Sequence, residues 1–120
     1  FISDSICYNS CRLAQRVDVN AIITMSFSGY TAYKIASQRP KANIFVFTSN
    51  RKILTQLNLV WGVRAFYYNK QISTDHTIAD IKYIMKSEKH LKQGDLIINI
   101  ASIPLEELGS SNMLKLSHVE

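Results

Sequence analysis

Two serines, one threonine and one glycine lie within six positions, directly after the first strongly apolar run of the chain. The side chains of Ser26, Ser28 and Thr31 can each donate a hydrogen bond to an oxygen of an anion, and Gly29 lets the backbone approach the same point closely. A helix that begins after this turn adds N–H groups and a dipole that favour negative charge. The pattern therefore predicts a site for an anion such as a phosphate group. The alternative interpretation is that Ser28 only caps the helix.

A strand before this turn and a helix after it are needed to position these groups. Residues 21–24 are apolar without alternation, which is typical of a central strand covered on both faces. Residues 30–38 carry apolar side chains on one side of a helix, which Pro40 prevents from continuing. The turn is thus expected at the carboxyl end of a parallel strand, where open sheets bind their ligands.

The rest of the chain continues the alternation of helices and strands. Further helices are predicted over 1–17, over 51–60 and from Ser73 to a point before Gly94, and further strands over 44–47, 63–68, 96–100 and 113–119. In the 51–60 helix, Leu57 and Trp61 have the spacing of one buried face. Strands joined by helices run parallel, whereas the helix-free link to the last strand allows it to lie at an edge in the antiparallel direction. The sequence therefore predicts one domain over 1–120, an α/β three-layer sandwich with helices on both faces of a five-stranded, mostly parallel sheet.

The charged residues are distributed unevenly along the chain. The formal net charge is +5, and the acid-free segment, residues 19–74, contains no Asp or Glu. The positive residues of this segment are Lys34, Arg39, Lys41, Arg51, Lys52, Arg64 and Lys70. This distribution suits an anionic partner, and a solvated surface without any ligand is the alternative. Nucleic acid is not the expected partner, because the positive residues are spread over several elements instead of lying with aromatic residues on one stripe.

Side chains for catalysis are lacking from the loops that follow the predicted parallel strands. Those loops contain no His or Cys, and His76, His90 and His118 fall on predicted helices or on the last strand, away from the serines. No metal-ligand spacing, dinucleotide-binding glycine pattern or Walker lysine is present. We therefore predict no catalytic residue, no metal site and no cofactor within this chain.

The two cysteines and the lengths of the apolar runs indicate where in the cell the protein is expected. Cys7 and Cys11 lie four positions apart on the first predicted helix, where disulfide geometry is poor and a metal site would be incomplete. They are expected to be small core residues. No apolar run approaches the roughly 18 residues of a membrane span, and the chain does not begin with a signal-peptide pattern. We expect a soluble, cytoplasmic protein with no membrane partner.

Short motifs along most of the chain match one known domain in their order and spacing. They are residues 21–24, Ser28-Gly29-Tyr30-Thr31, Arg39-Pro40, Thr48-Ser49-Asn50, Gly62-Val63, Lys92-Gln93-Gly94-Asp95 and Gly109-Ser110-Ser111-Asn112. The most specific portion is the Gly-Asp pair before an apolar strand, followed by Gly-Ser-Ser-Asn. Together these motifs resemble the C-terminal domain of pyruvate kinase.

The resemblance implies a sheet whose last strand is antiparallel, in the regulatory and oligomerisation domain of a homotetrameric glycolytic kinase. The parent enzyme makes pyruvate and ATP from phosphoenolpyruvate and ADP, and its catalytic residues and its Mg and K ions belong to a separate barrel domain. In family members regulated by sugar phosphates, the turn after the first strand holds a phosphate group and a later loop closes over the ligand. By position, the implied site consists of Ser26, Phe27, Ser28, Gly29, Tyr30, Thr31, Gly109, Ser110 and Ser111. The implied effector is a sugar phosphate or a nucleotide monophosphate. The alternative is that the domain binds no effector.

A second resemblance gives an alternative function. The pattern Ser-x-Ser-Gly-x-Thr after a strand is similar to the phosphate loop of flavodoxins, and Trp61, Tyr67 and Tyr68 are candidates to stack on a flavin. Flavodoxins begin with that strand and are usually acidic, whereas here a helix comes first and the acid-free segment is basic. A module that binds FMN is therefore the alternative to the regulatory domain.

Overall fold

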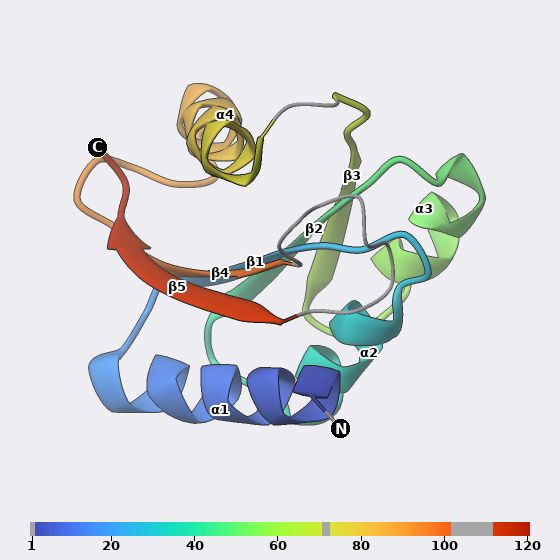
Figure 1. Ribbon diagram of the computed structural model, residues 1–120, viewed down its shortest axis with the longest axis horizontal. Coiled ribbons are helices and arrows are strands. Elements are labelled where there is room, and N and C mark those ends of the chain that lie inside the picture. Colours follow the sequence, from blue (N-terminus) through green and yellow to red (C-terminus); the bar gives the residue numbers. More distant parts are fainter. Residues whose placement is uncertain (1, 71–72, 102–111) are drawn as a thin grey trace.

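The computed structural model describes residues 2–70, 73–101 and 112–120, in which helices and strands alternate (Figure 1). The helices are α1 (Ile2–Val17), α2 (Tyr30–Ser37), α3 (Arg51–Asn58) and α4 (Thr74–Ser87), and the strands are β1 (Ala21–Met25), β2 (Asn43–Thr48), β3 (Val63–Tyr67), β4 (Leu96–Ala101) and β5 (Met113–His118). Every predicted helix and strand is present, with ends shifted by a few residues. Within the described ranges, no helix has the length and apolar character needed to cross a membrane.

The strands form one sheet in the order β3-β2-β1-β4-β5. β5 runs antiparallel to β4, and all other neighbouring strands are parallel. β1 lies at the centre, where Ile22 is paired with Ile44 of β2 on one side and with Ile98 of β4 on the other. Because both faces of β1 are covered, its uninterrupted apolar sequence is explained. The predicted five-stranded, mostly parallel sheet with an antiparallel last strand is confirmed.

Helices cover both faces of the sheet, but unequally. α1, α2 and α3 share one core, to which they contribute Cys7, Ile35 and Leu57, respectively. α4 alone contributes Ile81 and Met85 to the core on the other face. Figure 1 shows α1 and α2 on one side of the sheet and α4 on the opposite side. The predicted three-layer arrangement is therefore confirmed, and within the described ranges one of the outer layers holds a single helix.

The two cysteines belong to α1, and their side chains lie in the core. Cys7 is completely buried, Cys11 is 9% exposed, and both are free thiols. Burial raises the pKa of each thiol to about 11. The prediction that both are small core residues is confirmed.

α3 ends earlier than the sequence predicts. The helix stops at Asn58, and the chain then turns toward β3 through Gly62, whose φ of 73° is readily adopted only by glycine. Leu57 is fully buried, whereas Trp61 is 48% exposed, with the guanidinium carbon of Arg39 4.5 Å from its ring centroid. The expectation that Trp61 shares a buried helical face with Leu57 is wrong, because Trp61 lies beyond the end of the helix.

Candidate functional site

The hydroxyl-rich turn lies at the place where the order of the strands reverses. From β1 the chain passes through α2 to β2 on one side, whereas β4 lies on the other side of β1 and is reached only after α4. Thr24 near the end of β1 is paired with Ile100 near the end of β4, so the carboxyl ends of these two strands are neighbours. Open α/β sheets bind ligands at such a reversal point. The turn therefore occupies the position that the topology favours for a ligand.

Two hydroxyl groups of the turn hold two of its backbone N–H groups. The Gly29 N–H donates to Ser26 Oγ at 2.8 Å, and the Tyr30 N–H donates to Ser28 Oγ at 3.3 Å. The N-cap of α2 is Gly29, at a φ of 89°, which has no side chain of its own to accept a hydrogen bond from the helix. Ser28 thus serves the first residue of the helix without being its N-cap, so the capping interpretation is correct only in part. The arrangement presents N–H groups at a helix N-terminus whose present acceptors are side chains that can rotate away.

The turn is anchored to the next strand and helix. Its first N–H, that of Ser26, donates to the main-chain oxygen of Phe47 at 3.0 Å. The amide of Asn50, the N-cap of α3, donates to the main-chain oxygen of Phe27 at 3.1 Å. Asn50 is not among the residues predicted for the site. Its motif, Thr48-Ser49-Asn50, was part of the family resemblance, but it gave no sign of a contact with a turn more than twenty positions earlier.

The residues of the turn differ in how accessible they are. Ser28, Phe27 and Tyr30 are exposed, Ser26 is half-buried, and Thr31 is only 6% exposed. A ligand approaching from solvent therefore meets Ser28 and the two aromatic side chains first. Thr31 lies deeper, at the base of α2, and its hydroxyl is less accessible than that of Ser28.

An acid and a base from two helices lie beside Tyr30. Tyr30 Oη donates to Asp4 Oδ1 of α1 at 2.6 Å, and Lys34 Nζ of α2 lies 3.8 Å from the same oxygen. The hydrogen bond from Tyr30, reinforced by the charge of Lys34, lowers the pKa of Asp4. Lys34 is thus a cation one helical turn after Tyr30, in a site whose six turn residues include no basic side chain. Sequence reasoning missed this group, because Asp4 and Tyr30 are far apart along the chain.

The remaining predicted residues give a mixed result. Gly109, Ser110 and Ser111 lie outside the described residues. The prediction that the histidines lie away from the serines is wrong for His76. Its Nδ1 lies 2.6 Å from Ser73 Oγ. Ser73 is the N-cap of α4 and also accepts from the His76 N–H at 3.3 Å, so this pair forms the first turn of a helix. In the described part of the chain, no group of three or more His, Cys, Asp or Glu residues is arranged to hold a metal ion.

Comparisons with known proteins give one consistent result. A family model described as the pyruvate kinase alpha/beta domain matches residues 4–117. A pyruvate kinase from Lactobacillus delbrueckii subsp. bulgaricus is 35% identical to the chain over 115 residues, which are 96% of the chain and 20% of that protein. A pyruvate kinase from Geobacillus stearothermophilus is 36% identical over 118 residues, covering 95% of the chain and 19% of that protein.

A solved structure gives the same result for the fold. The crystal structure of a pyruvate kinase from Cryptosporidium parvum is similar with a TM-score of 0.86 and 22% identity, covering 100% of the chain and 23% of that protein. The chain thus has the fold of one part of a larger protein. It spans about a fifth of the length of the two bacterial relatives described above.

Proposed function

Because the chain belongs to the pyruvate kinase alpha/beta domain family, we propose that it is the C-terminal regulatory and oligomerisation domain of a pyruvate kinase. The parent enzyme would be a cytoplasmic homotetramer that makes pyruvate and ATP from phosphoenolpyruvate and ADP. In this proposal the phosphoryl transfer, with its Mg and K ions, takes place on a barrel domain outside this chain. The role of the chain is to carry subunit contacts and a control site.

We place the control site at the turn of residues 26–31. The observation that carries this proposal is the position of two N–H groups, those of Gly29 and Tyr30, at the N-terminus of α2 beside the reversal point of the sheet. A phosphate oxygen can replace the hydroxyl oxygens of Ser26 and Ser28 as the acceptor for these N–H groups. The released hydroxyls then turn to donate to the phosphate, and the hydrogen-bond count of the turn is preserved or increased.

The effector is a phosphorylated small molecule, either a sugar phosphate or a nucleotide monophosphate. Lys34 supports this class, because its ammonium group lies 5.8 Å from the ring centroid of Tyr30 and can offset part of the phosphate charge once it leaves Asp4. The family resemblance adds Gly109, Ser110 and Ser111 as residues that close over the ligand. An effector that binds one state of the tetramer more tightly would shift the population toward that state and so change activity on the distant catalytic domain.

The flavodoxin alternative finds less support. The strand order here is β3-β2-β1-β4-β5, whereas flavodoxins have the order 2-1-3-4-5. Of the three aromatic side chains considered for a flavin, Tyr68 is buried, and the other two carry an arginine on their rings. The guanidinium carbons of Arg39 and Arg51 lie 4.5 Å and 3.8 Å from the ring centroids of Trp61 and Tyr67.

Thermal unfolding of the chain with fructose 1,6-bisphosphate, ribose 5-phosphate or AMP tests the control site. A ligand present at about 100 times its Kd stabilises the folded state by about 2.7 kcal/mol, which raises the Tm of a domain of this size by several degrees. We expect at least one of the three to do so. The double variant Ser28→Ala and Thr31→Val should lose the shift, because it removes two hydroxyl donors while keeping the shape of the buried side chain.

Ser37→Ala is the matched control for the loss of a hydroxyl. Ser37 is exposed in the last turn of α2, where its hydroxyl donates to the main-chain oxygen of Lys34 at 2.7 Å. This variant should keep the full shift with the same ligand. If none of the three ligands stabilises the chain at millimolar concentration, the control site is refuted, whereas membership of the family is unaffected.

A further inference from the structure

A second group of polar side chains lies on the face of the sheet that α4 covers. In the pairing of β4 with β5, Asn99 is opposite Lys115, and Ser117 is opposite Ile97. Side chains alternate between the two faces of a strand, so Asn99, Lys115 and Ser117 share the face on which Ile97 packs beneath α4. Polar residues there are unexpected, because this face belongs to the core.

Asn99 has a buried donor without a partner. Its side chain is 3% exposed, and within the part of the chain that the structure describes its Nδ2 atom has no hydrogen-bond acceptor. The hydroxyl of half-buried Ser117 likewise lacks a partner. Leaving such groups unpaired costs free energy, so most buried polar groups in native proteins have a partner. Two such groups on one face indicate that something outside the described residues satisfies them.

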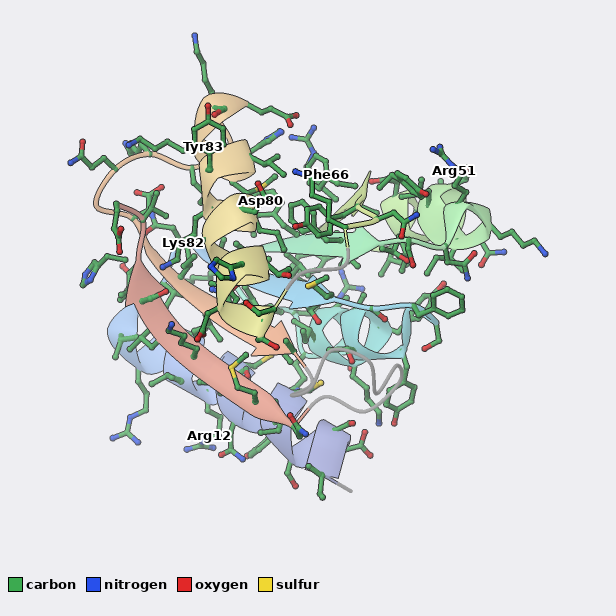
Figure 2. The ribbon with its side chains drawn as sticks, turned by 45° about the horizontal axis from the view of Figure 1, so that its top comes forward. Arg12, Arg51, Phe66, Asp80, Lys82 and Tyr83 are labelled. Carbon is green, nitrogen blue, oxygen red and sulfur yellow. The ribbon has the colours of Figure 1, made fainter. Side chains whose placement is uncertain are left out.

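Two lysines bring positive charge to the same place. Lys82 is half-buried on α4, and Figure 2 shows it on the side of the helix toward β5. Burial lowers the pKa of Lys82, the charge of Lys115 lowers it further, and the carboxylate of Glu120 opposes both. Lys115 is thus within electrostatic range of Lys82. Among the described residues neither lysine has a carboxylate within ion-pair distance.

The described groups around Lys82 and Lys115 do not balance the positive charge of these two lysines. Lys86, one turn further along α4, donates to the main-chain oxygen of Glu120 at 2.8 Å and adds another cation at that end. The opposite flank of α4 carries Asp80, which is engaged by Lys70 at 2.9 Å on the β3 side. Among the described residues, Glu120 is the carboxylate whose charge acts on Lys82, and the positive charges of Lys82, Lys86 and Lys115 outnumber it.

We propose that the α4–β5 site, formed by Lys82, Asn99, Lys115 and Ser117, binds a small dianionic oxyanion, either inorganic phosphate or a phosphomonoester. The two ammonium groups match its two charges, and the amide of Asn99 and the hydroxyl of Ser117 donate to its oxygens. A water molecule would satisfy the two polar groups but would leave half-buried Lys82 without an anionic partner, whereas exposed Lys115 is solvated. The α4–β5 site is separate from the turn of residues 26–31 and does not depend on its proposed role.

Nuclear magnetic resonance of the ¹⁵N-labelled chain tests this proposal through the side-chain amide of Asn99. We expect its resonances to move saturably when inorganic phosphate or glycerol 3-phosphate is added, and to move little with acetate at equal ionic strength. Movement with phosphate alone identifies the free ion as the ligand, and movement with both identifies any phosphomonoester. The single variants Lys82→Met and Lys115→Met should each weaken binding about tenfold or more, because each removes a charge-assisted contact.

Three further variants separate the outcomes. Lys41→Met removes an exposed lysine of the acid-free segment and should leave the affinity unchanged. In Asn99→Leu, phosphate should no longer shift the backbone amide resonances of β4 and β5, which it should shift in the unaltered chain. Thermal stability without phosphate should be preserved or raised, since an unpaired buried donor is removed. Ser28→Ala with Thr31→Val should not alter the response at Asn99. The proposal is overturned if the Asn99 resonances ignore phosphate, or if Lys82→Met and Lys115→Met bind phosphate as the unaltered chain does.

Discussion

At the scale of single residues, Gly29 has a structural role in addition to its place in the proposed site. Its φ of 89° is in the left-handed region, and a Cβ atom added there would lie 3.2 Å from Leu57 Cδ2 and 3.3 Å from Tyr33 Cε2. The backbone and the packing against α3 both favour glycine at this position. A bulky substitution would therefore disturb the fold together with any ligand, and hydroxyl variants are cleaner tests of binding.

Comparison with a second glycine separates these two effects. Gly94 has a similar φ of 92°, but nothing lies within 4 Å of an added Cβ. Gly94→Ala should lower the free energy of unfolding by about 1–2 kcal/mol, the usual cost of a left-handed alanine. Gly29→Ala should cost more because Leu57 must also move. Urea unfolding of both variants measures the difference, and equal losses would show that the crowding at Gly29 is relieved without cost.

At the scale of elements, α4 is joined to the sheet by polar contacts on its two flanks. On the β3 side, Tyr68 Oη and Lys70 Nζ donate to Asp80 Oδ2 at 2.7 Å and 2.9 Å. On the β5 side, Lys86 donates to the main-chain oxygen of Glu120. Because α4 is the only helix of the described chain on its face of the sheet, these contacts supplement a core that no second helix supports.

The contact of Tyr68 predicts a loss of stability in alkali. Burial and then the hydrogen bond to Asp80 raise the pKa of Tyr68 from 10.0 to about 12. A group whose pKa is higher in the folded state contributes stability in full below the unfolded pKa, and this contribution is lost as the pH rises through the folded value. The free energy of unfolding should therefore fall between pH 10 and pH 12, and less steeply in Tyr68→Phe. Denaturant unfolding over this range measures both slopes, and identical slopes would contradict the assignment.

At the scale of the whole molecule, the fold distributes the charges of the acid-free segment over aromatic rings. Five of its seven cations lie over a ring within 6.0 Å of the centroid. These pairs are Lys34 with Tyr30, Arg39 with Trp61, Arg51 with Tyr67, Arg64 with Phe66 and Lys70 with Tyr68. Such contacts stabilise cations, and Lys34 and Lys70 also pair with the carboxylates of Asp4 and Asp80. Much of the positive charge is thus explained without an anionic partner, and charge alone does not establish a ligand.

The buried thiols report on unfolding of the whole domain. The side chains of Cys7 and Cys11 of α1 lie in the core. Their pKa values of about 11 leave little thiolate near neutral pH. A thiol-specific reagent should therefore label them only as the chain opens, at a rate that rises with denaturant. Ser37→Cys, in a variant with both native cysteines changed to Ala, places one thiol at an exposed site and should react at once. Labelling of native Cys7 as fast as this control would show that α1 detaches locally.

The sequence by itself determined the order of the elements, the α/β class, the family and the turn at residues 26–31. These depend on apolar spacing, glycine conformation and motif order, which are encoded within a few neighbouring residues. The contact of Asp4 with Tyr30, that of Asn50 with Phe27, and the pairing of Asn99 with Lys115 join separate parts of the chain. Only the tertiary structure decided them, because strand order, register and the placing of α4 depend on the packing of all the elements together.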